Sequence, residues 1–506
     1  MKNLFKKLFT GSKNLSSDKV ESMSVTELLL QMNKSVDFLR FSNVTNDGSK
    51  KVWVNYYYTL IDTDFLHRDI LNHITSRPWS NLQDLKNILP IEAVTISSDS
   101  KEILEKMLTG FIFVQIGEHD KSGLLVRSEF VQTRAVSLPE VEFSVIGPKE
   151  SFVENVDSNI NMIRRRLSTP MLTIEEKLLG TMSRTRIATM YIEGIVNKDN
   201  VNIVKTRLDE VQFDHINDSS YIAQLISDND NTIFPLLLDS ERPDRVVSAL
   251  AEGKVVILVD GSPHGLIGPT TLVEFFSSFE DYYISYFLAS FFRLIRLFGV
   301  AFSILVTPLY VAVLTYHYEL IPKDLLSTLI SSRREVPLPP ILEAIFLELT
   351  IELLREAGAR LPTKVGQTIG IVGGIVIGTA SVEAGLTSNV LLIIVALAAL
   401  ASFTTPVYKM GNTIRLLRFP FLLFAQLWGL LGIVFCFCIL AAHLLRLTSL
   451  GRPYLEPIYP PRVTDMKDAL LRLPFSMQKE RPGQLRTQKP QRTIKQKQKF
   501  KKDIDE

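Results

Sequence analysis

The sequence predicts an α/β cytoplasmic region, expected to form two subdomains, followed by an all-α polytopic transmembrane domain. The 506 residues are 46% hydrophobic and 22% charged, with a mean hydropathy of +0.16, which is too apolar for a uniformly soluble chain. Charged and apolar residues are mixed up to about residue 280, whereas long apolar runs dominate from 285 to 447. Within the mixed part, helix-like segments alternate with strand-like segments.

Composition divides the chain into five segments. We expect a basic N-terminal tail over residues 1–25, a soluble subdomain of mixed helix and strand over 26–145, and a second soluble α/β subdomain over 146–280. The transmembrane domain covers 285–447, with four to six helices and room for one re-entrant element, and a polar, basic tail covers 448–506. The start of the chain lacks the apolar core of a secretory signal, so we expect the N-terminal region in the cytoplasm.

Periodicity predicts the elements of the soluble part. Apolar residues at helical spacing predict helices over residues 27–40, 101–108, 151–167 and 200–211. Apolar runs that begin or end near glycine predict strands over 110–116, 187–194 and 254–263. Turn-forming residues around Pro139 and Gly147 predict the boundary between the two soluble subdomains.

Four apolar runs are long enough to cross a bilayer, which takes roughly 20 residues. They cover 285–317, 368–386, 389–407 and 419–445, and the first is interrupted only by Arg293 and Arg296. The basic stretch 479–502 favours a cytoplasmic C-terminal end, and two cytoplasmic ends require an even number of crossings. Arg333, Arg334 and Arg360 conflict with external loops at their positions, so five or six crossings stay open. The basic tail is expected either to be a disordered, solubilising segment or to contact anionic lipid.

The apolar segment 337–358 carries charges that membrane segments normally lack. Its ionisable residues, with the arginine that follows it, are Glu343, Glu348, Glu352, Arg355, Glu356 and Arg360. On a helix, Glu348, Glu352 and Glu356 share one face, and the last two reach a following arginine at favoured spacing. Charges are costly in hydrocarbon, so this face must meet water, another charged helix, or a copy of itself. An acidic ring that lines a cation path would meet this requirement.

Two structural interpretations of the same segment stay open. The helix would lie on the membrane surface, or all its charges would be paired for stability. Pro337, Pro339 and Pro340 predict a rigid lead-in to the helix, because proline suits the first helical turn. The same feature suits a re-entrant or broken membrane helix.

A strip of glycines follows in the next apolar segment. Gly366, Gly370, Gly374 and Gly378 recur every four residues. In membranes such a strip lets two helices approach closely. The sequence therefore predicts close packing within the chain, packing between subunits, or a helix that slides during gating, and it does not separate these.

Catalytic and metal-binding patterns are absent from the sequence. No phosphate-binding loop is present, and no cluster of His, Cys, Asp and Glu has the spacing of zinc ligands. The two cysteines, Cys436 and Cys438, lie in one apolar run and exclude a disulfide scaffold. The net charge of +2 gives no indication of nucleic-acid binding. We therefore expect no enzymatic activity, no metal, no cofactor and no nucleic-acid partner.

Several ordered motifs resemble one family. They are VPLPP at 336–340, ELLREAGARLP at 352–362 and GGIVIG at 373–378 in the apolar part, and YIEG at 191–194 and VDGSP at 259–263 in the soluble part. Together they resemble the A subunit of bacterial spore germinant receptors, the GerA family. Leu338 and Thr379 stand where the family pattern leads us to expect an aromatic residue and glutamine.

The resemblance implies a membrane subunit of a nutrient sensor in the spore inner membrane. The implied partners are a transporter-like B subunit that binds the germinant, a lipoprotein C subunit, membrane lipids and further copies of this chain. The resemblance also implies a homo-oligomer, a pentamer, around a central ion-conducting path. The alternative function is a non-conducting membrane scaffold or modulator of a germination complex.

Overall fold

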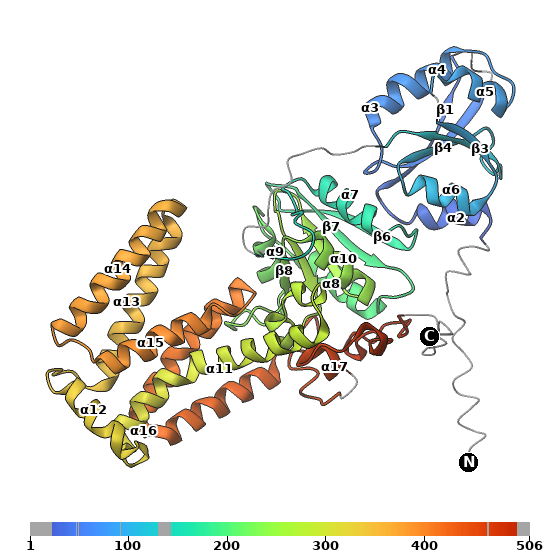
Figure 1. Ribbon diagram of the computed structural model, residues 1–506. Coiled ribbons are helices and arrows are strands. Elements are labelled where there is room, and N and C mark those ends of the chain that lie inside the picture. The colour runs from blue at the N-terminus through green and yellow to red at the C-terminus, as the bar shows by residue number, and fades with distance from the viewer. Residues whose placement is uncertain are drawn as a thin grey trace, which may run out of the picture.

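The computed structural model describes residues 23–492, except 47, 49, 92, 130–141, 143, 463 and 464, and it describes only the backbone of 363–372 and Lys467. Most of the predicted N-terminal tail, the tail beyond Arg492, and Pro139 of the predicted boundary lie outside these residues. Figure 1 shows two sheets and a helical region that follow one another in space in chain order.

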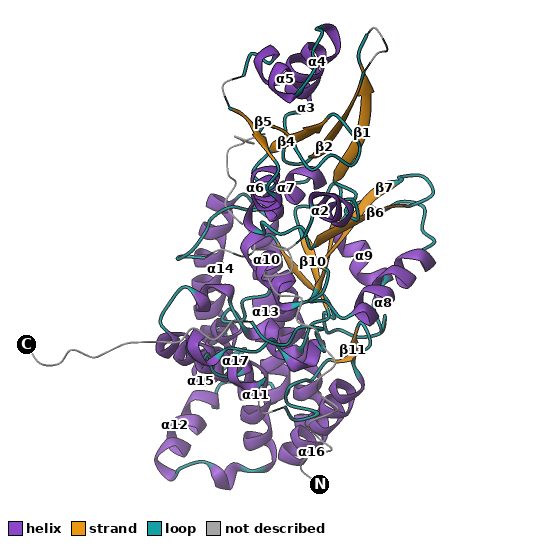
Figure 2. Cartoon of the chain, turned by 90° about the vertical axis from the view of Figure 1, so that its right-hand side faces the viewer, coloured by secondary structure: helices purple, strands orange, loops and turns teal. Residues whose placement is uncertain are grey.

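The first sheet has five antiparallel strands in the order β1-β2-β4-β5-β3. Its strands are β1 (Phe38–Val44), β2 (Lys51–Tyr57), β3 (Val94–Ser97), β4 (Phe111–Gln115) and β5 (Gly123–Arg127). Helices cover both faces, as Figure 2 shows: α2 (Val25–Met32) and α6 (Ser100–Met107) on one, and α3 (Thr63–Phe65), η1 (Leu66–Leu71), α4 (Asn72–Ser76) and α5 (Leu82–Ile88) on the other. Side chains alternate along each strand, so Phe113 faces α6 while its neighbours Ile112 and Val114 face the other layer.

The helix predicted over residues 27–40 is wrong in its second half. Helix α2 is started by a capping box between Ser24 and Glu27, and it ends at Met32. The chain then turns, and Leu39 lies in β1, which pairs with β2. The apolar spacing continued across a helix and a strand, and periodicity alone did not show the turn between them.

The second sheet is also antiparallel, in the order β6-β7-β9-β10-β8. Its strands are β6 (Leu172–Leu179), β7 (Thr185–Ile192), β8 (Leu238–Ser240), β9 (Val255–Val259) and β10 (Gly265–Gly268). One face packs against α7 (Val156–Arg166) and α10 (Pro243–Glu252), and the other against α8 (Lys198–Glu210) and α9 (Ser219–Leu225). Because both faces are covered, all five residues of β9 are buried, which explains the unbroken apolar run there.

Most of the predicted soluble elements are confirmed. The helices predicted over 101–108 and 200–211 correspond to α6 and α8, and the three predicted strands correspond to β4, β7 and β9. The helix predicted over 151–167 begins later, at Val156, because Asn155 caps it. The predicted α/β region is thus a mixture of helices and strands in which both sheets are antiparallel.

A buried ion pair joins the two sheets. Asp37, just before β1, lies 2.7 Å from Arg164 of α7, and both side chains are fully buried. The guanidinium also receives support from Ser35 at 3.0 Å and from the ring of Tyr57. The backbone nitrogen of Val36 donates to the carbonyl of Ile174 in β6, so the turn after α2 is fixed against the second sheet.

Two short helices, η2 (Leu272–Phe276) and η3 (Phe279–Tyr282), lead from the second sheet into the helical region. This region contains α11 (Tyr286–Tyr316), α12 (Lys323–Arg333), α13 (Pro340–Arg360), α14 (Thr363–Glu383), α15 (Asn389–Ser402) and α16 (Tyr408–Arg446). Among the described residues, α11 and α16 are long and apolar enough to cross a membrane. Helix α12 was not predicted, and α15, with 14 residues, is only about 21 Å long.

Helix α16 is a helical hairpin. Trp428 and Gly429 have non-helical backbone angles, and Gly429 has a φ of 61°, which favours glycine. The rings of Phe424 and Phe435 lie 5.8 Å apart, although eleven residues of straight helix would separate them by about 16 Å. The hydroxyl of Tyr316 donates to the carbonyl of Gln426 at 2.7 Å, next to the turn. The prediction of one span over 419–445 is therefore wrong, because two antiparallel legs, 408–427 and 430–446, occupy this region.

Six helical legs run between two ends of the helical region within the described residues. We call the end beside the second sheet the near end and the end beside the α16 turn the far end. Helix α11 starts at the near end, α13 starts near the far end, where Ile341 packs with Val311, and α15 returns to the near end, where Thr404 lies beside Gly299. Helix α14 runs back toward the far end, and the two legs of α16 run to the far end and return. The chain therefore enters and leaves the helical region at the near end.

After α16 the chain folds back on the second sheet. Asp228 accepts hydrogen bonds from the backbone nitrogens of Leu450 and Gly451, at 2.9 and 2.8 Å. Burial raises the pKa of Asp228, but hydrogen bonds from Arg207, Thr448 and Gly451 outweigh burial and hold it below its ordinary value. This return segment forms β11 (Thr448–Ser449), β12 (Arg452–Pro453), α17 (Met466–Ala469), η5 (Phe475–Met477) and η6 (Gly483–Leu485).

The described part of the basic tail is not the disordered segment of the first expectation, and its contact with anionic lipid stays a prediction. Arg481 donates to the carbonyl of Ala251 at 2.8 Å, and Arg492 pairs with Glu252 at 2.7 Å. Leu485 is fully buried. Residues 479–492 are therefore anchored against the end of α10, while side chains such as Lys479 and Arg486 remain exposed to solvent.

Candidate functional site

The charged segment folds as one continuous helix, α13. Pro339 occupies the N-cap position and Pro340 the first turn, while Pro337 lies in the segment that leads into the helix. The helix runs without a break to Arg360 over 21 residues, about 31 Å. The charges therefore lie along one rigid rod, and their surroundings change from one end to the other.

At the middle of α13, Glu348 forms a buried ion pair with Arg418 of the first leg of α16. The two side chains are 4% and 3% exposed. Thr307 of α11 donates to Glu348 at 3.0 Å, and Arg418 donates to Ser303 of α11 at 2.7 Å and more weakly to the carbonyl of Ala398 in α15. The pair therefore fastens four helices together, and neighbouring groups satisfy most of its hydrogen-bonding capacity.

Toward the far end, Glu343 is also enclosed within the chain. Its side chain is fully buried and lies 2.8 Å from Arg333 at the end of α12. The backbone nitrogen of Ser388, the N-cap of α15, donates to it at 3.2 Å. Glu343 thus ties α12 and the start of α15 to α13.

Toward the near end, the carboxylates become exposed. Glu352 pairs with Arg355, and Arg415 of α16 lies 3.6 Å away, but the Glu352 side chain remains 38% exposed. Glu356 pairs with Arg360 and is 57% exposed. Both predicted pairs within the helix are present, and each leaves a partly open charged surface.

A second charged cluster holds the near end of α11. Asp281 of η3 is buried and pairs with Arg293 at 3.0 Å and with Arg296 at 2.8 Å. Arg293 also reaches Asp468 of α17 at 3.1 Å. Arg472 donates to the carbonyl of Asp281 at 2.7 Å, so the return segment, η3 and α11 meet at one point.

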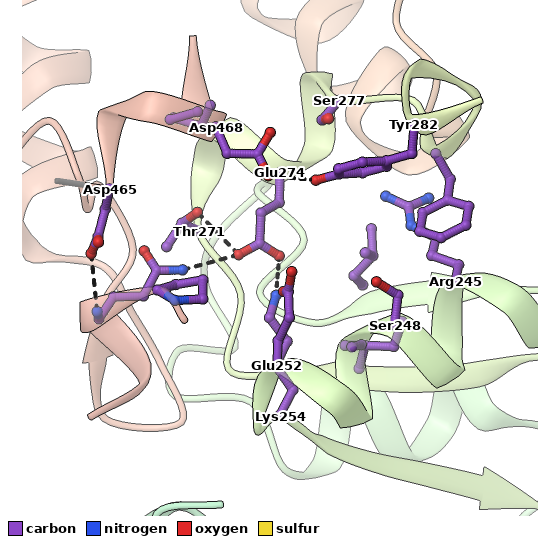
Figure 3. Close-up of a pocket in the computed structure, with 18 of the residues that line it drawn as sticks. Arg245, Ser248, Glu252, Lys254, Thr271, Glu274, Ser277, Tyr282, Asp465 and Asp468 are labelled. Atoms are coloured by element: carbon purple, nitrogen blue, oxygen red, sulfur yellow. Dashed lines mark hydrogen bonds and ion pairs between the residues drawn. The ribbon is translucent and has the colours of Figure 1, made fainter. Parts of the chain in front are cut away.

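A cavity lies beside this junction, between α10, η2 and the return segment (Figure 3). Figure 3 shows Glu274 within hydrogen-bonding reach of Lys254 and Thr271. The side-chain amide of Gln484 also donates to Glu274, at 3.2 Å. Burial raises the pKa of Glu252 on its wall, and the nearby Arg492 and Lys254 offset part of this effect. The polar groups of the wall largely form hydrogen bonds and ion pairs with one another, so we interpret the cavity as part of the packed interface between these segments.

Comparison with known proteins identifies the family. The family model described as Bacillus/Clostridium GerA spore germination protein matches residues 26–484. The chain belongs to the GerA family. It is 51% identical to spore germination protein GerQA of Bacillus cereus over 91% of this chain and 92% of that protein. It is 39% identical to spore germination protein A1 of Bacillus subtilis over 83% of this chain and 87% of that protein.

A crystal structure is also similar to part of this GerA-family chain. It contains the N-terminal domain of the A subunit of the Bacillus megaterium spore germinant receptor GerK3. The alignment covers 48% of this chain and 92% of that domain, with 26% identity and a TM-score of 0.36.

Sequence reasoning missed the arginines that complete the site of this GerA-family chain. Arg415 and Arg418 lie three residues apart, just before the apolar run that was taken to start at residue 419. Arg333 precedes α13 by a short turn. An inventory of opposite charges in the apolar part would have found all three, because a buried carboxylate requires a partner.

The glycine strip of α14 is only partly placed. Gly366 and Gly370 lie in residues 363–372, for which the structure describes only the backbone. A Cβ added at Gly374 would meet no atom within 4 Å, and one added at Gly378 would make ordinary contact with Leu392. The tight approach to α13 occurs instead at Gly373, where a Cβ would lie 2.9 Å from Leu354. The role of the strip in packing or gating stays a prediction.

Proposed function

We propose that this chain is the A subunit of a nutrient germinant receptor in the spore inner membrane. In this proposal it is a multi-pass protein with its soluble domain on the cytoplasmic side. It forms a homo-oligomer, a pentamer, around a cation path, together with a transporter-like B subunit and a lipoprotein C subunit. Membership of the GerA family supports the role in germination, and the geometry of α13 supports the path.

The depth of the charges follows from helix lengths. Arg418 lies nine residues before the turn of α16, and Thr307 lies nine residues before the end of α11. At about 1.5 Å per residue, both are about 13 Å from the far end. If the far end lies at one boundary of a hydrocarbon layer about 30 Å thick, the Glu348–Arg418 pair lies at its middle.

The observation that carries the proposal is the exposure of Glu352 at nearly this depth. Arg415, its partner on α16, is only three residues nearer the soluble domain than Arg418. A charged residue facing lipid near the centre of the bilayer costs about 2.5–3.5 kcal/mol on insertion scales. Contact with further copies of α13 around a water-filled path removes this cost and forms an acidic ring for cations.

The test is reconstitution of the purified receptor in liposomes, with measurement of potassium flux and of particle symmetry. Glu352→Gln is expected to assemble normally and to reduce cation flux, because it removes charge from the path while the amide oxygen of glutamine can still accept a hydrogen bond from Arg355 or Arg415. Glu105→Gln, at an exposed position on α6, is the matched control and should leave flux unchanged. Normal flux in the Glu352 variant would contradict the acidic ring.

A non-conducting scaffold is the second candidate function. It is favoured by Glu343 and Glu348, which are paired inside one chain and need no pore to explain them. The same reconstitution separates the two functions. Particles without cyclic symmetry and liposomes without conductance, at normal receptor assembly, would support the scaffold.

A further inference from the structure

The first third of α11 has two opposite faces. Ala289 and Arg293 are buried on one face, where Asp281 and Asp468 hold the arginine against the soluble part. The other face carries seven aromatic or aliphatic side chains that are 42–74% exposed. These are Phe287, Leu288, Phe291, Phe292, Leu294, Ile295 and Phe298. We call these seven residues the aromatic face.

Helix α11 is longer than a crossing requires. Its 31 residues extend about 46 Å, whereas a hydrocarbon layer of about 30 Å needs about 20 residues. Counted from Tyr316 at the far end, the crossing ends near residue 297. Residues 286–296 add about 16 Å of helix, more than the roughly 5–7 Å of one headgroup layer, so α11 must enter the membrane at a tilt for these residues to lie at the lipid surface.

We propose that the aromatic face lies in the headgroup and upper acyl layer of the membrane, and that it seats the second sheet directly on the lipid surface. Helices with phenylalanine and leucine on one face and basic residues on the other lie at this level of a bilayer. The aromatic face begins at Phe287, next to the soluble domain, and further phenylalanines follow deeper along the helix.

Lipid suits this face better than water or a charged partner. No charged side chain interrupts the face, since Arg293 and Arg296 both turn to Asp281. The soluble domain cannot cover the face, because the arginine side of the same helix turns already faces that domain. The junction at Asp281 therefore fixes the rotation of α11 so that the aromatic face points away from the second sheet.

The consequence is a fixed depth for the soluble domain. A chain suspended by a flexible linker would let the second sheet move freely above the membrane. Here Asp281, Asp468 and Arg472 bind the start of α11 rigidly, so a helix rotation in the membrane is transmitted to the second sheet.

Spin labels on the full chain in nanodiscs test the proposal. Phe287→Cys and Phe291→Cys are labelled with a nitroxide after Cys436→Ala and Cys438→Ala remove the native thiols. Accessibility is measured to oxygen, which partitions into lipid, and to a water-soluble nickel chelate. Labels on the aromatic face should show severalfold higher oxygen than nickel accessibility, at a shallower depth than a label in mid-span.

Two control positions set the scale. Phe213, exposed on the soluble domain, should report water, and Leu309, exposed in mid-span, should report deep lipid. Nickel accessibility at Phe287 and Phe291 equal to that at Phe213 would overturn the proposal, because the face would then be in water. Protection from both reagents would also overturn it, because another copy or a partner subunit would then cover the face.

Discussion

Loss of the Arg418 charge alone should destabilise the helical region strongly. Arg418→Met leaves Glu348 buried at 4% exposure without its cationic partner, and Thr307 alone cannot replace it. Removal of one member of a buried ion pair costs about 3–5 kcal/mol. The reciprocal change, Glu348→Leu, should cost a similar amount, because it leaves an arginine unpaired among four helices.

The double variant should recover most of that loss. Two apolar side chains of similar size remove both charges at once, and such replacements are often neutral or stabilising by about 1–4 kcal/mol. The expected coupling therefore far exceeds the roughly 0.6 kcal/mol that is average for hydrogen bonds between membrane helices. Arg360→Met, which breaks the exposed pair with Glu356, is the control and should change stability by less than about 1 kcal/mol.

The assay is unfolding of the purified chain in mixed micelles by a denaturing detergent, followed for the two single variants, the double variant and the control. Free energies of unfolding then give the coupling between the two sites. Effects that simply add would refute the reasoning, because they would mean that Glu348 and Arg418 are satisfied independently of each other.

Three further changes test other parts of the fold. Gly432→Ala should prevent recovery of monodisperse protein, because its Cβ would clash with the carbonyl oxygen of Phe424 in the opposite leg, whereas Gly374→Ala, in open space, should not. Asp228 has a lowered pKa in the folded protein, so its stabilising effect is complete above about pH 4 and is lost as the pH falls through its folded-state pKa. The return segment should therefore become more sensitive to protease in acid, and Asp228→Asn should abolish this dependence on pH. Asp37→Asn should lower the free energy of unfolding by about 3–5 kcal/mol and increase amide hydrogen exchange where the two sheets meet. Lys34→Ala, which breaks an exposed pair, should lower it by less than about 1 kcal/mol.

Local elements were predictable where one periodicity held over their whole length. Strand β9 and helix α8 were found because each is a single uninterrupted pattern with clear ends. The helix predicted over 27–40 was wrong in its second half because the apolar spacing continues from α2 into β1. The turn there is fixed by Asp37 and its partner Arg164, 127 residues later, and no local pattern contains that contact.

The hairpin of α16 shows the same limit in the membrane part. Lipid-facing and helix-facing positions are both apolar, so hydropathy registers one long segment where two legs lie side by side. The turn depends on Gly429, on a close approach at Gly432, and on Tyr316, which caps the end of the first leg from another helix. A glycine pair in an apolar run is too common a pattern to predict such a turn.

The sequence predicted that the acidic helix α13 differs from the other apolar segments, but it did not predict which of its carboxylates are buried and which are exposed. Spacing placed Glu348, Glu352 and Glu356 on one face, yet the tertiary fold covers only part of that face with Arg418 and Arg415. Which carboxylate is covered depends on where α16 crosses α13, and this is a property of the packed bundle.

This division has a consequence for the proposed cation path. Glu348 cannot face a cation without first giving up Arg418, so a path that uses it would require the four-helix junction to open. Glu352 needs no such rearrangement, because its carboxylate is already partly open while it pairs with Arg355. Neutral substitutions at Glu348 and Glu352, one helical turn apart on α13, should therefore have different effects. Neutralisation at Glu348 should appear first as loss of folded receptor, and neutralisation at Glu352 as altered ion flux through a receptor that still assembles.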